Sequence, residues 1–473
     1  MIELVEKIRT FPPGKFKLPK LKTYRKGEIA GIVRVSDRCV GCDTCRTQCP
    51  TGAMKGEIGV RHEIDYDMCI NCGQCLINCP FGAIEQMSFL DEVMKKLDEG
   101  WTVVAIVAPA VRVAIAEEFG KPPGTLTVAR LHAALKKAGF KIYENNFAAD
   151  QTIMEEGTEL IGRVAYWELG LKEIEFEITD SYPITWRKKV KLDLREFEKK
   201  PLPQFTSCCP AWVRYAEVYY PEILPHISSC KSPQQMAGPT AKTYGALKVW
   251  NVNPEKVYTV GIMPCTAKIY EASRPEFKSA WKWLREKGII PDTVPPFRDV
   301  DAVLTTRDLA ELFRRKGINP LEFPENEKPE NFEWYSGGGT IFGTSGGVME
   351  AAMRFAWSVL SGREPPATSE AWNFVKVRGY THPRVHASIT IPLKSELRKE
   401  TGIDEVTLNV CVVNGIGFRG MHLKPVIDEV LSGTSRYHFI EVMTCPGGCL
   451  NGGGQPVEPM GTSWIDPVLP LPL

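Results

Sequence analysis

Two cysteine runs with the same spacing constrain this sequence more than any other feature. "CVGCDTCRTQCP" begins at residue 39 and "CINCGQCLINCP" begins at residue 69. Both read C-x2-C-x2-C-x3-C-P, the bacterial ferredoxin spacing, in which the fourth cysteine of a run ligates the cluster of the other run. The sequence therefore predicts two [4Fe–4S] clusters with two ligand sets, which are Cys39, Cys42, Cys45 with Cys79, and Cys69, Cys72, Cys75 with Cys49.

Zinc is the alternative metal for closely spaced cysteines. Zinc sites usually combine two C-x-x-C pairs or mix cysteine with histidine, whereas each run here has four cysteines and a proline. Pro50 and Pro80 bend the chain so that each fourth thiolate can reach the other run. We therefore expect residues 31–88 to form a small ferredoxin-like domain that carries electrons.

The composition limits the partners and the compartment. The chain has 473 residues, enough for two or three domains, and 58 basic against 57 acidic residues. This balance argues against nucleic acid or an anionic membrane as the main partner. The longest apolar run, Val103 to Val111, is too short for a membrane span, and the N-terminal stretch lacks the apolar core of a signal peptide. With fifteen cysteines and no export signal, metal chemistry is favoured over disulfides, and we expect a soluble, cytoplasmic protein.

The remainder of the chain predicts an α/β domain. Residues 1–30 look like an extension, and from residue 89 to residue 465 apolar strand-like runs alternate with amphipathic helices. Segments 172–180 and 189–195 alternate charged and apolar residues, which predicts a β-hairpin inside an insertion at 164–204. The charged face of this hairpin is expected to be a solvated surface, with a docking edge as the alternative. Residues 466–473 are expected to be a short C-terminal tail.

Three stretches hold most of the remaining cysteines, and they read "TSCCPAW" (206–212), "MPCTAKIYE" (263–271) and "EVMTCPGGCLNGGGQP" (441–456). Neighbouring side chains in an extended segment point to opposite faces, so Cys208 and Cys209 are badly placed to ligate one iron together. Glycines in the last stretch allow the backbone to approach a cofactor closely. A third four-thiolate set is therefore plausible, although buried cysteines often only pack, as we expect for Cys230 and Cys411.

In this order, the three stretches resemble the signature motifs of the [FeFe] hydrogenases, and the resemblance runs from about residue 31 to residue 456. It implies a ferredoxin-like α+β domain followed by an α/β catalytic domain with mixed sheets flanked by helices. It also implies an H-cluster, a [4Fe–4S] cube joined through a cysteine thiolate to a two-iron unit with carbon monoxide, cyanide and azadithiolate. The implied reaction is 2H⁺ + 2e⁻ ⇌ H₂.

The resemblance assigns roles residue by residue. The cube ligands would be Cys209, Cys265, Cys445 and Cys449, and Cys449 would bridge to the two-iron unit. Lys268 would donate to a cyanide, since a fixed cation offsets ligand charge that water cannot reach. The other residues of the implied pocket are Ala108, Pro109, Ser232, Gln234, Met263, Phe342 and Met443.

The resemblance also gives Cys208 a role separate from that of Cys209. A thiol has an ordinary pKa of about 8.5 and can pass protons, so Cys208 would be the proton donor of the pocket. Onward transfer is expected in the order Glu159, Ser228, Glu156, with Arg163 at the surface end. The alternative is that Glu155, Glu156 and Glu159 only form the solvated face of a helix.

The implied partners are ferredoxin or a redox subunit, maturation proteins that make the two-iron unit, and further subunits of a larger hydrogenase complex. Hydrogen and protons are the implied substrates. Two alternatives stay open, a sensory homologue with low turnover and a non-enzymatic iron–sulfur electron-transfer or assembly protein. Sensory relatives usually lose the relay cysteine, and assembly relatives lack the intact "MPCTAK" and "CPGGC" pair, so the sequence favours the catalytic alternative.

Overall fold

The computed structural model describes residues 22–24, 28–180, 186–325, 330–366 and 382–457. The chain divides into two compact units, each assembled from segments that are distant in the sequence. Unit 1 comprises residues 1–143, 238–331 and 450–473, and unit 2 comprises residues 144–237 and 332–449. The predicted tail at 466–473 and most of the predicted extension at 1–30 lie outside the described residues. Within that extension, β1 (Lys22–Tyr24) pairs antiparallel with β2 (Glu28–Ala30).

The two cysteine runs of unit 1 fold as a duplicated strand–helix–strand arrangement. Its elements are β3 (Val33–Val35), α2 (Thr44–Thr47), β4 (Met54–Lys55), β5 (Glu63–Ile64), α3 (Gln74–Ile77) and β6 (Ile84–Gln86). Strand β3 pairs antiparallel with β6, and β4 pairs antiparallel with β5. Each short helix follows a residue in the left-handed conformation, Asp43 (φ 71°) in the first repeat and Gly73 (φ 74°) in the second. The duplication seen in the sequence therefore extends to the backbone.

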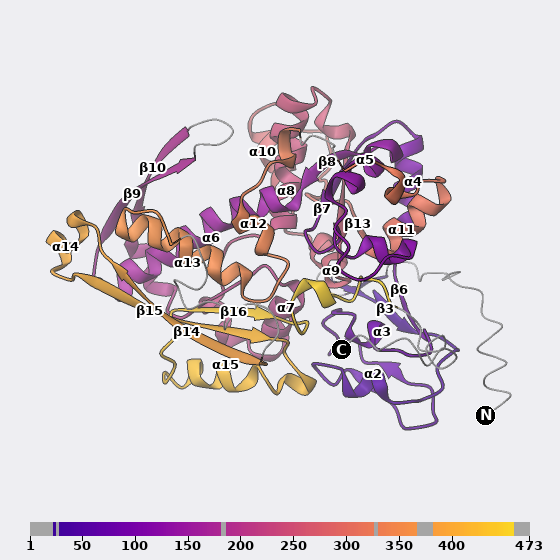
Figure 1. Ribbon diagram of the computed structural model, residues 1–473, viewed down its shortest axis with the longest axis horizontal. Coiled ribbons are helices and arrows are strands. Elements are labelled where there is room, and N and C mark those ends of the chain that lie inside the picture. The colour runs from indigo at the N-terminus through magenta and orange to yellow at the C-terminus, as the bar shows by residue number, and fades with distance from the viewer. Residues whose placement is uncertain (1–21, 25–27, 181–185, 326–329, 367–381, 458–473) are drawn as a thin grey trace. The chain divides into compact units, whose positions relative to one another are not determined.

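Unit 1 also contains a four-stranded sheet in the order β13–β12–β7–β8 (Figure 1). Its strands are β7 (Thr102–Val107), β8 (Lys141–Glu144), β12 (Val257–Met263) and β13 (Ala302–Thr305). Strand β12 is parallel to both β7 and β13, and every residue of β12 and β13 is buried. Burial of consecutive residues means that both faces of the sheet are covered, as is usual for parallel strands.

Helices and short helical turns complete unit 1. The α-helices are α4 (Leu90–Asp98), α5 (Val128–Ala138), α9 (Ala267–Ser273), α10 (Ser279–Glu286) and α11 (Thr306–Arg315). The other turns are η2 (Ile115–Phe119), η5 (Ala241–Val249, a π-helix), η6 (Pro254–Lys256), η7 (Pro320–Glu322) and η8 (Asn331–Glu333). Helix α11 starts with a capping box in which Thr305 and Asp308 bond each other's backbone N–H, an arrangement that stabilises helix starts.

Unit 2 is built on a mixed sheet in the order β11–β16–β15–β14. Its strands are β11 (Gln204–Phe205), β14 (Arg384–Pro392), β15 (Glu405–Asn414) and β16 (Phe439–Met443). Strand β16 runs parallel to β11 and β15, and β14 is antiparallel to β15. Figure 1 shows α15 on one side of this sheet and α13 on the other. Helices α6 and α13 contribute Leu160, Ile161, Met349 and Met353 to the apolar core beside it.

The helices of unit 2 carry much of its polar interior. They are α6 (Asn145–Trp167), α7 (Pro210–Tyr219), α12 (Gly337–Ile341), α13 (Gly347–Ser361), α14 (Ser395–Thr401) and α15 (Lys424–Leu431). Helix α8 (Pro233–Thr240) begins in unit 2, and its residues from Gly238 onward belong to unit 1. Shorter turns are η3 (Leu194–Lys199), η4 (Pro221–His226), η11 (Phe418–Gly420) and η12 (Cys449–Asn451).

Among the described residues, no helix combines the length and apolar character needed to cross a bilayer.

The alternating segments after α6 form the expected hairpin. Strands β9 (Glu173–Asp180) and β10 (Trp186–Asp193) pair antiparallel, and the residues between them, 181–185, lie outside the described part of the chain. One face buries Ile174 and Phe176 in the core of unit 2. The other face carries ion pairs such as Lys191 Nζ–Glu173 Oε2 at 2.9 Å. Charged and apolar residues therefore alternate in these strands because one face of the hairpin is buried and the other is solvated, as the sequence suggests.

Candidate active site

The first ligand set gathers around Cys45 in unit 1. Burial, and the neighbouring thiolates of Cys79, Cys39 and Cys42, raise the pKa of the Cys45 thiol to about 12. The fourth cysteine of the second run therefore lies with the first three of the first run. This is the crossed arrangement that the ferredoxin spacing predicts. Cys42 is the exposed member of this set.

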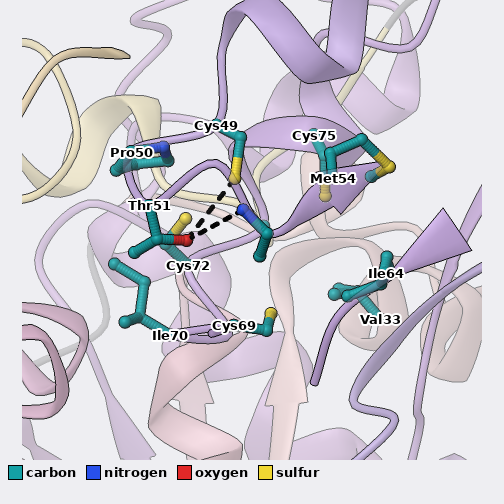
Figure 2. Close-up of a pocket in the computed structure, with 12 residues that line it drawn as sticks. Val33, Cys49, Pro50, Thr51, Met54, Ile64, Cys69, Ile70, Cys72 and Cys75 are labelled. Carbon is teal, nitrogen blue, oxygen red and sulfur yellow. Dashed lines mark hydrogen bonds between the residues drawn. The ribbon is translucent and has the colours of Figure 1, made fainter. Parts of the chain in front are cut away.

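The second set surrounds a cavity, shown in Figure 2. Cys49, Cys69, Cys72 and Cys75 line this cavity together with apolar side chains, among them Val33, Met54, Ile64 and Ile70. Thr51 Oγ1 lies 3.6 Å from Cys49 Sγ and accepts a hydrogen bond from Ala53 N at 3.3 Å. Cys49, from the first run, thus faces the three cysteines of the second run across a shared cavity.

The surroundings of both sets fit [4Fe–4S] clusters. Backbone N–H groups donate to three of the sulfur atoms, Asn71 N to Cys69 at 3.4 Å, Ala83 N to Cys79 at 3.3 Å and His62 N to Cys39 at 3.5 Å. Such donors stabilise the negative charge of iron-bound thiolates and tune cluster potentials. Among the described residues, no three Cys, His, Asp or Glu side chains converge on a single ion. A cube holds its irons at separate corners, so its ligands need not converge on one point.

The second set lies beside the "MPCTAK" stretch of unit 1. Thr266 Oγ1 donates to Asn71 O at 2.7 Å, and Cys265 is among the thiolates that add to the burial-driven rise in the pKa of Cys72. A Cβ atom on Gly73 would lie 2.6 Å from Thr266 Oγ1 and 2.8 Å from Gly453 Cα. Gly73 therefore permits a close approach that a side chain would block. Cys72 and Cys265 are near neighbours, whereas Cys42 at the other cluster faces solvent.

Unit 1 places its other predicted pocket residues after two parallel strands. Ala108 and Pro109 follow β7, and Met263 ends β12, with Ala108 N donating to Ile262 O at 3.0 Å. The carboxyl ends of parallel strands share an edge of the sheet, which is where α/β folds bind ligands. Lys268, on α9, forms an ion pair with Glu271 at 2.9 Å.

In unit 2, strand pairing brings two of the cysteine stretches together. Because β11 and β16 are parallel neighbours, the residues that follow them leave the sheet at the same edge. Cys209 Sγ lies 3.3 Å from Thr444 Oγ1, next to Cys445. The thiolate of Cys449 is also close enough to act on Cys208. Three of the four predicted cube ligands, Cys209, Cys445 and Cys449, therefore belong to one structured edge.

This edge contains a close backbone approach and buried polar atoms that fit a bound group. A Cβ atom on Gly448 would lie 2.7 Å from Ser345 N, and Gly448 has a φ of 91°, so the position suits glycine. Ser232 Oγ and Ser345 Oγ are buried and have no hydrogen-bond partner within the described ranges. Buried hydroxyl groups normally have partners, so the hydroxyl of Ser345, the residue beside Gly448, fits a site whose bound group accepts a hydrogen bond.

Cys208 faces different neighbours from Cys209. It packs against the apolar cluster that contains Phe342 and Met443, two residues predicted for the pocket. Burial raises the pKa of the Cys208 thiol well above its ordinary value, and the charges of Glu156, Cys209 and Glu441 add to the effect. The thiol therefore keeps its proton at neutral pH until a neighbouring group accepts it.

The acidic residues of α6 differ sharply in environment. Glu155 is exposed, whereas Glu156 is 1% and Glu159 7% exposed. Glu156 Oε1 accepts from Ser207 N at 3.3 Å, and burial, reinforced by the charge of Glu159, raises the pKa of Glu156 to about 8. Ser228 hydrogen-bonds Glu156 and also donates to Glu159 Oε2 at 3.1 Å. A continuous polar path thus crosses the interior of unit 2, and the solvated-face alternative holds only for Glu155.

Two details of the predicted relay are wrong. Glu156, not Glu159, lies next to the Cys208 segment, so the contacts run Cys208, Glu156, Ser228, Glu159. Residues three apart on a helix lie on the same face about one turn apart, so spacing alone could not decide which of the two is nearer to Cys208. Arg163 was expected at the surface, but its side chain is 0% exposed and bonds Glu159 Oε1 at 2.6 Å.

Glu441 is a further buried acidic residue near Cys208 that no motif or spacing had indicated. This residue lies in the apolar strand β16, where its carboxylate accepts from Gly346 N at 2.6 Å and Met349 N at 2.8 Å at the start of α13. Burial raises the pKa of Glu441 to about 7. An acidic residue inside the run "FIEVM" is the signal that could have identified it, since buried strands rarely carry an unpaired charge.

Comparison with known proteins agrees with this geometry. The model of the "Iron only hydrogenase large subunit, C-terminal domain" matches residues 101–453, and the "4Fe-4S binding domain" matches residues 32–55 and 62–85. The periplasmic [Fe] hydrogenase large subunit of Nitratidesulfovibrio vulgaris is 44% identical over 433 residues, which are 89% of this chain and 85% of that protein.

A solved structure and a more distant relative extend the comparison. A variant of [FeFe]-hydrogenase HydA1 from Chlamydomonas reinhardtii aligns with a TM-score of 0.59 and 33% identity, over 79% of this chain and 85% of that chain. Cytosolic iron-sulfur assembly component 3 of Mus musculus is 29% identical over 366 residues, 75% of this chain and 62% of that protein. The match across residues 101–453 and the relative at 44% identity show that this chain belongs to the iron-only, or [FeFe], hydrogenases.

Proposed function

We propose that this enzyme catalyses 2H⁺ + 2e⁻ ⇌ H₂ at an H-cluster held by Cys209, Cys265, Cys445 and Cys449. When bound, the H-cluster supplies the iron centre at which protons and electrons combine or separate. One observation carries the proposal: a half-buried thiol, Cys208, lies between the edge that holds three of these cysteines and a path of buried polar groups. A cluster that only passed electrons would not need a proton path.

The four cluster thiolates would have distinct neighbours. Cys209, Cys445 and Cys449 lie at one edge of unit 2, and the proposal takes Cys265, which follows β12, as the fourth ligand. The hydroxyl groups of Ser232 and Ser345 are buried donors for the charged ligands of the bound group. Lys268 would turn from Glu271, 2.9 Å away, toward a cyanide, and Ala108, Pro109, Gln234, Met263, Phe342 and Met443 would exclude water.

Electrons would pass through the two [4Fe–4S] clusters in a fixed order. The first ligand set includes the exposed Cys42, and its exposure suits contact with an external electron donor or acceptor. The second ligand set includes Cys72, which neighbours Cys265. We therefore infer entry at Cys42, with ferredoxin or a partner subunit as donor, and exit from Cys72 toward Cys265. The relative from Nitratidesulfovibrio vulgaris is named a large subunit, which supports a partner subunit here.

Protons would move along the buried path of unit 2. During hydrogen formation, Cys208 would donate a proton in the pocket and then take one from Glu156. The high pKa of Glu156, about 8, keeps this carboxyl protonated at neutral pH, so it is ready to donate. Ser228 would pass a replacement proton from Glu159, whose pKa is held low because Arg163 and Lys200 outweigh its burial. Hydrogen oxidation would use the same groups in reverse.

The cell compartment is also part of the proposal. Fifteen cysteines favour a reducing compartment in which thiols stay free to bind iron, so we infer the cytoplasm. A relative at 44% identity is named periplasmic, so the family does not decide the compartment. Fractionation of the native cells, with the chain detected by antibody, would test this inference.

A second candidate function is iron–sulfur assembly without hydrogen chemistry, because an assembly component is 29% identical over 366 residues. Infrared spectroscopy on anaerobic protein matured by the dedicated maturation proteins separates the two. Sharp iron-bound carbonyl and cyanide bands that change under hydrogen would support the hydrogenase. A full set of cubes without such bands would overturn it and favour assembly. Bands without turnover would point to a sensory homologue.

A further inference from the structure

The buried path of unit 2 reaches solvent at a place that the relay residues themselves do not explain. The side chains of Glu159 and Arg163 are 7% and 0% exposed. Lys200 is a partly exposed ionisable group beside this carboxylate, with 31% of its side chain accessible and its Nζ atom 3.9 Å from Glu159 Oε1. The solvent end of the path therefore lies on the Lys200 side of Glu159.

A series of hydrogen bonds joins Lys200 to the path. Lys200 Nζ donates to Ser229 Oγ at 3.4 Å, and Ser229 Oγ donates to Glu159 Oε2 at 2.9 Å. Ser229 N donates to the same carboxylate oxygen at 2.9 Å, which fixes the hydroxyl beside it. Ser228 and Ser229 both donate to Glu159 Oε2, and Ser228 also bonds Glu156 whereas Ser229 also bonds Lys200.

Arg163 cannot serve as this exit. Its guanidinium donates to four backbone carbonyl groups, those of Pro201, Pro225, His226 and Ile227, at 2.7 to 3.3 Å. Its remaining bond, to Glu159, is an ion pair in the interior. Arginine does not lose its proton in proteins, so Arg163 positions Glu159 and the two loops but does not pass protons.

We propose that Ser229 and Lys200 form the solvent end of the proton relay. The proposal rests on the proposed function and deepens it. In the inward step, the Lys200 ammonium gives a proton to Ser229 Oγ as the Ser229 hydroxyl proton passes to the Glu159 carboxylate. Water then reprotonates the Lys200 amine, and the outward step reverses these transfers. No electron moves in either step.

The inserted segment holds Lys200 in place for this role. Lys200 follows η3, which comes after the β9–β10 hairpin, and its backbone N–H donates to Phe197 O at 3.0 Å. Its carbonyl accepts from Trp167 Nε1 at 3.1 Å, and its Nζ lies 5.2 Å from the centre of the Phe197 ring. Phe197 is buried in the core of unit 2. The insertion predicted at 164–204 thus contributes the exit.

The test measures how fast the buried path exchanges protons with solvent, in full-length protein made without the maturation proteins. A rapid pH jump across pH 8 is followed by infrared absorption of the Glu156 carboxyl group, with the band assigned by its loss in Glu156→Gln. An ordinary lysine binds a proton about six pKa units more tightly than a glutamate. Inward transfer is therefore uphill, and Lys200 is expected to control the rate of equilibration and not its end point.

We expect Lys200→Met and Lys200→Arg each to slow the carboxyl response at least tenfold, because neither side chain can release a proton. Ser229→Ala should slow it similarly, whereas Lys199→Met, a change of the exposed neighbour, should match the unmodified chain. An unchanged rate in Lys200→Met would overturn the proposal, and so would full rescue by Lys200→Arg, since only charge would then matter. The H-cluster is not needed, so missing carbonyl bands in matured protein would reject only the proposed function.

Discussion

In the proposed reaction, the cysteine repeats of unit 1 would carry electrons and the buried polar path of unit 2 would carry protons, but the sequence encodes the two regions differently. In the repeats, six of the eight candidate ligands are followed by the next ligand of the same run after two or three intervening residues, and a short turn brings them together. In the path, Glu156, Cys208 and Ser228 come from three separate segments. Metal ligands set by local spacing tolerate changes elsewhere, whereas a proton path depends on how distant segments pack.

The largest effects should come from breaking the repeats. Cys49→Ser combined with Cys72→Ser should remove one cube, about four irons, because both line the same cavity. Cys49→Ser combined with Cys42→Ser should remove two cubes, about eight irons. Iron and sulfide analysis with electron paramagnetic resonance would count them. Equal iron loss in the two double variants would contradict the crossed ligand sets.

Replacing a single carboxyl group should interrupt proton transfer along the buried path. Glu156→Gln is expected to lower hydrogen turnover about 10²- to 10⁴-fold, because an amide cannot pass a proton from Ser228 to Cys208. Glu155→Gln, the exposed neighbour on α6, should leave turnover unchanged. The carbonyl and cyanide bands of matured protein should persist in both variants. Equal turnover of the two variants would exclude Glu156 from the relay.

The buried ion pair of the path should matter for stability as well. Arg163→Met leaves the Glu159 charge buried without its partner and should lower the free energy of unfolding by about 3–5 kcal/mol. Lys191→Met breaks an exposed ion pair of the hairpin and should cost at most about 1 kcal/mol. Urea denaturation monitored by circular dichroism would compare them. A loss for Arg163→Met no larger than that for Lys191→Met would show that solvent screens Glu159.

Within a single pH unit, the smallest effect is a pH dependence of stability. The pKa of Glu156 rises from 4.5 to about 8 on folding, so the folded state holds this proton more tightly. Its stabilising contribution is complete below pH 4.5 and is lost as the pH rises through about 8. In that window the contribution falls by up to about 1.4 kcal/mol per pH unit. The free energy of unfolding would be measured against pH for the unmodified chain and for Glu156→Gln, and the difference between the two curves should isolate this slope. Identical slopes in the two proteins would mean that Glu156 is ionised in the folded state.

Much of the fold was predictable from apolar patterns. The runs around Val103, Val257 and Ala302 became the buried strands β7, β12 and β13, because their length and lack of charge suit only the interior of a parallel sheet. The hairpin followed from its period of two. The division into units was not predictable, since unit 1 takes residues 238–331 from the middle of the chain. Contiguous boundaries cannot describe such a unit.

By itself, the sequence determined which residues can bind iron, because thiolate ligands on short spacings reach a cube whatever surrounds them. Only the tertiary structure decided the order of Glu156 and Glu159, the burial of Arg163 and the hydrogen bonds of the buried Glu441. Burial and charge separation set the pKa of each group, and both depend on segments far away in the sequence. The ligands are a property of the chain, whereas the proton path is a property of its packing.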